Sequence, residues 1–409
     1  SINSELEEMG EIQGAGKAMI LRKITLPLVL PAILSAVILT FSKAIGTFGT
    51  INYLGSPVQY YTLSSQLYMN INSRDTQTGF AMAILMIIIA SIAVFVNQKL
   101  IGSRKSYATI GGKGGRSTLI GLGKVGRPVI TAALFVFFAV GIIMPIVILV
   151  MESFMLKEGI YSLDNFTLHY WIGESNPQIM EGLPGIFKND EFINSLFNSL
   201  RLTLVNGVFG TIFGQLLGYI TAKGRGRLHG KLVEQLVFIP YLIPSVAFGG
   251  IYLSMFSQPQ QIFGVTLVPA LYGTFALLTL VSVVKHLPFA ARAGTSNMLQ
   301  ISGELEEAAT IEGAGFFRRF VKIVFPLSKG GFISGFMLIF VSIMKELDLI
   351  ILIMTPTTST LPYLAFRYQN GNSPQASDCV AIVMFSIVFL VYAIANLSGK
   401  ADLAKSMAG

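Results

Sequence analysis

Long apolar runs alternate with polar segments along the whole chain. A helix needs about 20 predominantly apolar residues to cross the roughly 30 Å hydrocarbon core of a bilayer, because each residue rises about 1.5 Å. Eight stretches meet this requirement, over residues 28–54, 79–100, 128–151, 195–221, 232–256, 264–286, 328–354 and 378–397. The pattern therefore predicts an all-α, polytopic transmembrane helical protein.

The polar segments between these runs differ in charge, which orients the chain. Residues 99–127 carry seven Lys or Arg and no acid, and residues 223–231 carry four Lys or Arg. Residues 152–192 instead carry seven acids against two lysines. Because cytoplasmic loops are rich in Lys and Arg, the first two segments are predicted to be cytoplasmic and the third external. Counting spans from these anchors also places residues 1–27 and 287–327 and the C-terminus on the cytoplasmic side.

Four short motifs recur at a constant offset of 299 residues within the two long cytoplasmic segments. They pair Glu5–Glu8 with Glu304–Glu307, Gly14–Gly16 with Gly313–Gly315, Lys23–Ile24 with Lys322–Ile323, and Pro27–Leu28 with Pro326–Leu327. Two apolar spans with an external loop between them follow each copy. Such a repeat is typical of transporters built from two tandem homologous halves, with the substrate path between them. The second half has six predicted spans and the first only two, so we expect the first half to be truncated.

Each copy predicts a short helix, a turn and an amphipathic helix at the cytoplasmic face. Residues 303–314 are rich in Glu and Ala, which favour helices, and the acids stand in the first turn, where the helix dipole favours them. Gly313 and Gly315 end or bend this helix, and a basic and aromatic helix over 316–325 leads to Pro326. One such copy could be an ordinary surface hairpin. Two copies at equivalent positions favour a functional role.

The second copy has a characteristic spacing. Glu307, Ala308 and Ala309 are followed by Gly313 after three residues, by Ile323 after nine more and by Pro326 after a further two. This pattern resembles the EAA loop of importer-type ABC transporter permeases, a coupling helix that docks into a cleft of the ATP-binding subunit. The resemblance therefore implies an ATPase-coupling role for Glu307, Ala308, Ala309, Gly313, Ile323 and Pro326, and for Glu8, Gly14, Ile24 and Pro27 of the first copy. The first copy departs from the pattern with Met9 and Gly10 where two alanines are expected.

The resemblance covers the whole chain and is greatest to fused, two-half permeases of the ferric-iron type. It implies a first permease half ending in residues 1–101, with its EAA loop and two spans, then a basic cytoplasmic linker over 102–127. A second half of six spans follows over 128–409, with its EAA loop at 301–327. Related permeases for thiamine, aminoethylphosphonate or polyamine leave the substrate open.

The resemblance also implies a location and partners. We expect a multi-pass protein of the prokaryotic inner membrane that forms the translocation path, contacts the lipid bilayer and works with two ATP-binding cassette subunits and an extracytoplasmic solute-binding protein. No Gly-x4-Gly-Lys-Ser/Thr phosphate loop occurs in the sequence, so ATP hydrolysis is assigned to a separate subunit and this chain is not expected to be an enzyme. A secondary transporter with fused repeats is the less favoured alternative, since it would not need two cytoplasmic amphipathic loops.

Composition excludes several other classes. Charged residues make up 12% and hydrophobic residues 53% of the chain, with a mean hydropathy of +0.66, which excludes a cytosolic enzyme or a disordered chain. The net charge of +8 belongs to the cytoplasmic loops rather than to a nucleic-acid surface. Because Cys379 is the single cysteine and the three histidines are scattered, we expect no disulfide, metal site, cofactor or catalytic residue.

Charged residues interrupt one predicted span. Lys345, Glu346 and Asp348 lie within 328–354, where an ionised side chain costs about 2.5–3.5 kcal/mol unless it is paired or hydrated. On a continuous helix, Lys345 and Asp348 would meet on one face. These residues, together with Lys43 in the equivalent first-half span, are predicted either to line the translocation path or to hold the two halves together.

Glycines recur at helical spacing in another span. Gly210, Gly214 and Gly218 repeat every four residues, and Gly331 with Gly335 repeats the spacing once. Small residues at this spacing let a neighbouring backbone approach closely. We therefore expect helix packing there, with sliding of the packed helices as the alternative.

Overall fold

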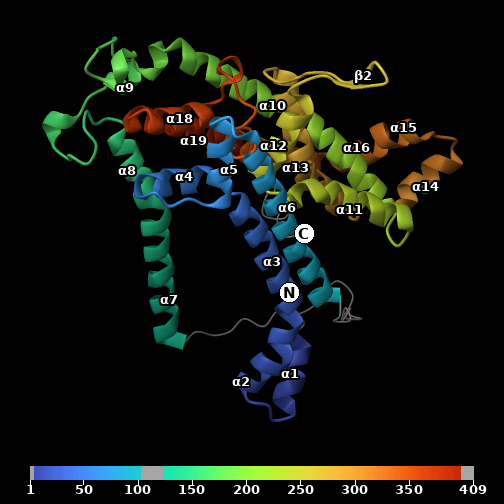
Figure 1. The fold of residues 1–409 in the computed structure, drawn as a ribbon. Coiled ribbons are helices and arrows are strands. Elements are labelled where there is room, and N and C mark those ends of the chain that lie inside the picture. The colour runs from blue at the N-terminus through green and yellow to red at the C-terminus, as the bar shows by residue number, and fades with distance from the viewer. Residues whose placement is uncertain (1–3, 103–122, 398–409) are drawn as a thin grey trace. The chain divides into compact units, whose positions relative to one another are not determined.

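The computed structural model describes residues 4–102 and 123–397. Within these ranges the regular elements are helices apart from one short hairpin of strands, so the all-α prediction is confirmed (Figure 1). Residues 103–122 of the predicted basic linker lie outside the described ranges. By its internal contacts the chain divides into two compact units, Ser1–Ile45 with Ile87–Val147 and Gly46–Met86 with Ile148–Gly409.

The first unit contains the first copy of the repeat and the helix that follows the linker. Its elements are α1 (Ser4–Ile12), α2 (Lys17–Ile20), a π-helical turn (Leu21–Thr25), α3 (Leu26–Gly46), α7 (Gly123–Phe138) and a second π-helical turn (Ala139–Ile143). Two further helices pass from one unit to the other, α6 (Thr76–Gly102) and α8 (Met144–Glu152).

The second unit contains the remaining elements. Its longer helices are α4 (Gly49–Gly55), α5 (Leu63–Asn72), α10 (Asp190–Lys223), α11 (Leu228–Leu242), α12 (Ser245–Phe256), α13 (Phe275–Met298), α14 (Gly303–Ile311), α17 (Lys329–Met344), α18 (Leu361–Asn370) and α19 (Pro374–Leu397). Its short elements are α9 (His169–Ile172), β1 (Gln260–Ile262), β2 (Val265–Val268), α15 (Phe316–Arg319), a π-helical turn (Phe320–Val324), α16 (Phe325–Leu327) and 3-10 turns at Ser56–Val58, Leu163–Asn165, Met180–Gly182, Ile186–Lys188 and Pro356–Thr358.

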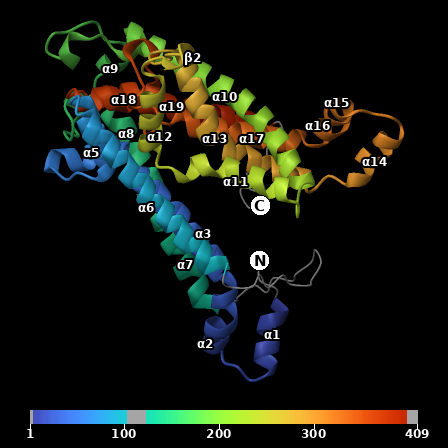
Figure 2. The ribbon, with the colours of Figure 1, turned by 45° about the vertical axis from the view of Figure 1, so that its right-hand side comes forward.

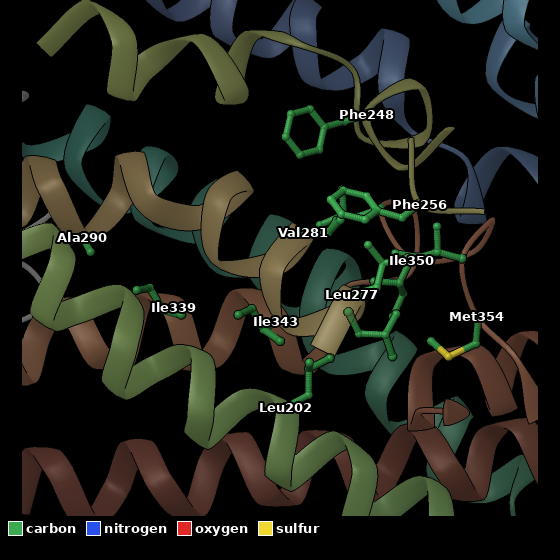
Figure 3. Packing of buried hydrophobic residues seen from close by; sticks show 13 residues of the cluster. Leu202, Phe248, Phe256, Leu277, Val281, Ala290, Ile339, Ile343, Ile350 and Met354 are labelled. Atoms are coloured by element: carbon green, nitrogen blue, oxygen red, sulfur yellow. The ribbon is translucent and has the colours of Figure 1, made fainter. Parts of the chain in front are cut away.

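The main core of the second unit lies where α10 packs against α13 and α17 (Figure 2). Leu202, Leu277, Val281, Ile339 and Ile343 are almost fully buried and gather between these three helices (Figure 3). Each buried aliphatic side chain of this size contributes about 1.5–3 kcal/mol where water is the alternative environment. The cluster therefore fixes the helices that support the second repeat copy.

Five helices of the described part are long and apolar enough to cross a membrane. Two bent pairs raise the number to seven: α11 with α12, bent by 98°, and Phe316–Leu327 with α17, bent by 76°. A shorter apolar helix, Ala36–Gly46, is the C-terminal part of α3. The sequence pattern predicted eight spans, and the differences concern breaks within apolar stretches rather than missing stretches.

The predicted span over 264–286 is wrong at its N-terminal end. Residues 260–268 form the antiparallel hairpin β1–β2, and α13 begins only at Phe275. Phe263 and Gly264, between the strands, have φ values of 52° and 79°, and two-residue hairpins favour positive φ at both turn positions. Residues 264–268 of the hairpin are mostly apolar, so hydropathy alone could not separate them from the helix.

The predicted spans over 28–54 and 328–354 are wrong at their C-terminal ends. Helix α3 ends at Gly46 and α17 at Met344. After α17, the carboxylate of Glu346 accepts a hydrogen bond from the Leu349 backbone N–H at 2.9 Å, which closes a turn instead of continuing the helix. Lys345 and Asp348 are therefore not on one helix face, and that expectation is wrong.

Candidate functional site

Both copies of the repeat fold as a helix, a glycine turn and a second helix, as predicted. Each element of the first copy begins and ends 299 residues before its counterpart in the second copy. The counterparts are α1 and α14, α2 and α15, and the two π-helical turns that follow them. The glycine turns also agree, since φ is +79° at Gly14 and +77° at Gly313. We call residues 4–25 the first loop and residues 303–324 the second loop.

The residues assigned by the resemblance lie mainly on the surface of the two loops. In the second loop Glu307, Ala308 and Gly313 are exposed and Ala309 is half-buried. Ile323 is half-buried, while Pro326 just beyond the loop is exposed. In the first copy the exposed members are Glu8, Gly14 and Pro27, and Ile24 is half-buried.

The most exposed large apolar side chain among the described residues of each loop is one that sequence reasoning did not single out. Ile12 is 85% exposed and Ile311 is 86% exposed, and the two are repeat equivalents at the ends of α1 and α14. An isoleucine this exposed gains free energy when a partner surface covers it. The repeat itself was the available signal, because position 12 and position 311 carry the same residue.

The second loop is tied to α10 through Glu306, whose side chain is 9% exposed. Tyr219 Oη donates a hydrogen bond to Glu306 Oε2 at 2.7 Å, and Lys223 Nζ lies 2.6 Å from Glu306 Oε1. The Tyr219 ring also packs against the rings of Phe316 and Phe320, with centroids 5.6 and 5.8 Å away. Sequence reasoning missed this anchor, since nothing along the chain links positions 219 and 306.

The first loop is held by internal contacts. Thr25 Oγ1 donates a hydrogen bond to Glu7 Oε1 at 2.6 Å, and Glu7 is the repeat equivalent of Glu306. Gly10, where the family pattern expects alanine, lies against Ile20 and Ile24, and a methyl group there would stand 2.9 Å from Ile24 Cδ1. The departure from the pattern thus coincides with close packing between α1 and the segment that follows it.

Two of the charges predicted within a span, Glu346 and Asp348, lie half-buried around the end of α17. His286 Nε2 lies 3.4 Å from Glu346 Oε2, and Gly49 N–H donates to Asp348 Oδ1 at 2.9 Å. Lys345 is exposed at the helix end. Lys43 lies in α3, which belongs to the first unit.

A buried lysine that sequence reasoning missed stabilises the bend between α11 and α12. Lys285 Nζ donates to the backbone carbonyls of Pro240, at 2.9 Å, and Ile243. These carbonyls are at the C-terminal end of α11, where the last C=O groups of a helix have no N–H donor within the helix. Lys285 is only 7% exposed, so its position on α13 fixes the broken span from inside the unit.

The glycines of α10 face two different helices. A methyl group at Gly214 or Gly218 would meet the α13 backbone at Ala290 or Gly294, whereas at Gly210 it would meet only Cδ1 of Ile339. Gly331 lies against the side chain of Asn297, between α17 and α13. The backbones of α10 and α13 therefore approach without intervening side chains along this stretch.

The segment 152–192, which the charge pattern predicts to be external, contacts α18. Asn189 Nδ2 donates to Tyr368 Oη at 3.0 Å, and Asn189 also caps α10. At the surface, the hydrogen bond and positive charge of Lys188 lower the pKa of Glu174. The segment thus has a defined conformation on the side that the charge pattern predicts to be external.

The described residues contain no group of three or more His, Cys, Asp or Glu side chains that could hold a metal ion. Cys379 is buried, and its Sγ lies 3.6 Å from the Ser153 carbonyl oxygen. The arrangement offers exposed surfaces on the two loops and a half-buried group of charged residues after α17.

Comparisons with known proteins agree with this arrangement. The family profile described as binding-protein-dependent transport system inner membrane component matches residues 1–107 and 210–401, and each stretch contains one of the two loops. A ferric transport system permease protein of Actinobacillus pleuropneumoniae is 22% identical over 100% of this chain, which spans 56% of that protein's length. A sulfate transport system permease protein of Synechocystis sp. is 26% identical over 50% of this chain and 71% of its own.

A solved structure shows the same fold. It is a bacterial ABC transporter involved in the import of the acidic polysaccharide alginate, with a TM-score of 0.52 and 16% identity over 66% of this chain and 94% of the matched chain. The family suggested by the EAA-loop spacing is confirmed, because the profile covers well over half of the residues. The chain is therefore a multi-pass inner membrane protein that belongs to the family of binding-protein-dependent transport system inner membrane components.

Proposed function

We propose that the chain is part of the membrane-spanning permease of an ABC importer and couples solute movement to ATP hydrolysis by separate subunits. The duplicated loop carries this proposal. Two copies with matching helix bounds, matching left-handed glycines and equally exposed isoleucines supply two similar docking surfaces. Two similar surfaces fit two ATP-binding subunits, one for each loop.

The contacts of the second loop suggest how docking reaches the membrane part. Glu306 ties α14 to Tyr219 and Lys223 at the end of α10, and α13 leads into α14 after only four residues. Displacement of α14 would therefore move both α10 and α13, the helices whose backbones pack at Gly214 and Gly218. In this proposal the assigned residues of each loop, from Glu8 to Pro27 and from Glu307 to Pro326, transmit that displacement.

The two loops also support a chain plan of two permease halves. In the proposed plan residues 1–101 end the first half, 102–127 link the halves and 128–409 form the second. On the external side, an extracytoplasmic binding protein would deliver solute to a surface that includes 152–192.

Ferric iron is the proposed solute. The ferric permease relative is similar over the full length of the chain, both loops included, whereas the sulfate permease relative is similar over half of it. A protein that shares only one half supports the fold of that half more than the solute of the whole path. Sulfate import is the second candidate, on the strength of that relative.

Co-purification and uptake test the proposal together. The complete transporter, expressed together with candidate ATP-binding and solute-binding proteins from the same organism, should retain an ATPase through detergent purification. In proteoliposomes it should accumulate radioactive ferric iron in an ATP-dependent manner, with sulfate, thiamine and a polyamine as comparison solutes. Uptake driven by an ion gradient without ATP would contradict the importer, and accumulation of another solute would contradict iron alone.

A further inference from the structure

Two pairs of repeat-equivalent residues contact each other in the second unit. Gly49 and Asp348 differ by the repeat offset of 299 residues, and the Gly49 N–H donates to Asp348 Oδ1 at 2.9 Å. From α5 to α18 the offset is 298 residues, which makes Tyr68 equivalent to Phe366. The rings of this pair lie with centroids 6.0 Å apart.

Such self-contacts locate a local two-fold axis. When two copies of a structure are related by a two-fold rotation, a residue touches its own equivalent only next to the rotation axis. Gly49 with Asp348 and Tyr68 with Phe366 therefore place the axis of the repeat between α4–α5 and the segment from 345 to α18. A path between two homologous halves follows their common axis.

The two copies differ in charge at this axis. Gly49 brings no side chain where its equivalent brings a carboxylate, and Thr47 stands where its equivalent is Glu346. Glu346 has a partner on each carboxylate oxygen, because His286 Nε2 lies 3.4 Å from Oε2 and the Leu349 N–H donates to Oε1 at 2.9 Å. Asp348 Oδ1 instead accepts from the uncharged backbone N–H of Gly49, and no salt bridge within the described part of the chain involves this carboxylate.

We propose that Asp348 is a specificity-determining residue of the translocation path, which selects cationic over anionic solutes. The inference rests on the proposed permease function and deepens it by naming the charge of the solute. In this structure the Gly49 N–H is hydrogen-bonded to the Asp348 carboxylate. When the two repeats separate, a cation replaces the N–H as the partner of Asp348, whereas an oxyanion is repelled by the same group.

Asp348→Asn and Asp348→Glu test the charge in the complete importer in proteoliposomes. Asparagine keeps an oxygen that can accept from Gly49 N–H but removes the charge, and glutamate keeps the charge. Ferric uptake should fall by at least about tenfold in Asp348→Asn, because a desolvated charge pair is lost. Uptake should recover in Asp348→Glu, and binding-protein-stimulated ATPase activity should persist in both variants. The matched control is Glu234→Gln, which removes an exposed carboxylate of α11.

The outcomes separate the inference about Asp348 from the proposed function. Wild-type ferric uptake in Asp348→Asn overturns the inference, as does joint loss of uptake and ATPase stimulation in both variants, which indicates a structural role. A wild-type transporter that moves sulfate and not iron overturns the proposed solute together with the inference. If the wild type moves iron and Asp348→Asn does so equally well, the importer stands and only the inference fails.

The axis can be tested without transport. In a Cys379→Ser background, cysteines at Tyr68 and Phe366 should be joined by a short bifunctional thiol reagent in membranes. A control pair of Tyr68→Cys with Leu397→Cys, on the exposed C-terminal end of α19, should not be joined. Failure of the first pair to cross-link would contradict the position of the two-fold axis, and with it the position of Asp348 next to that axis.

Discussion

At the scale of single residues, the glycine turns of the two loops have the most specific requirement. Gly313 has a φ of +77°, and no atom lies within 4 Å of the place that an added methyl group would take, so its constraint is the backbone and not space. Gly315, two residues on, has equally open surroundings but an extended backbone with φ of −69°. The same substitution at Gly313 and at Gly315 therefore distinguishes the effect of backbone strain from the effect of a larger side chain.

Gly313→Val is expected to uncouple ATP hydrolysis from uptake without preventing membrane insertion. A non-glycine residue in the left-handed region costs about 1–2 kcal/mol, and branching at Cβ makes this worse, so the turn between α14 and α15 should change shape. Gly315→Val should behave like wild type. The measurement is the ratio of solute transported to ATP hydrolysed, and equal ratios in both variants would contradict the role of the turn.

Glu306 offers a second test at this scale. Replacing it with Gln removes the charge that Lys223 and Tyr219 share, which should weaken the attachment of α14 to α10 by about 1–2 kcal/mol. Limited proteolysis of the second loop should then accelerate, while Glu304→Gln, at an exposed position of the same helix, should leave the cleavage rate unchanged. Equal protection in the two variants would show that the tie contributes nothing.

At the scale of elements, the α10–α13 contact depends on where each glycine faces. Gly214→Ala should destabilise the protein by about 1–3 kcal/mol, because its methyl group meets the backbone at Ala290 and cannot be accommodated by a rotamer change. Gly210→Ala meets only the flexible end of Ile339 and should cost less. Thermal unfolding of the detergent-solubilised protein compares the two, and an equal loss would contradict the assigned faces.

The elements also show what sequence could and could not predict. The duplicated loop was predictable, since its helices and glycine turn depend on residues close together in the chain. The break after Met344 could not be predicted, because residues 349–354 are as apolar as a membrane span. The turn depends on one hydrogen bond, which the Leu349 N–H donates to the Glu346 carboxylate. Hydropathy likewise merged the β1–β2 hairpin with α13. The contacts of Glu306 and Lys285 join distant segments, so only the fold brings them together.

At the scale of the whole molecule, the proposed function requires both loops on the cytoplasmic side. In a Cys379→Ser background, single cysteines at Glu8 and Glu307 should react with a membrane-impermeant maleimide only after cells are permeabilised. A cysteine at Glu158, in the external segment, should react in intact cells. Labelling of either loop position from outside would contradict the orientation set by the charges and the coupling role with it.

Each loop is joined to its span by a π-helical turn, Leu21–Thr25 before α3 and Phe320–Val324 before α16. Such a turn holds one residue more than an α-helical winding. Removing a single residue from Phe320–Val324 would therefore restore an ordinary α-helical winding with little change of azimuth, whereas removing one from the α-helical part of α17 would swing everything before it by about 100°. The wide turn thus absorbs a one-residue change in length without re-aiming α14 and the exposed Ile311 at its end.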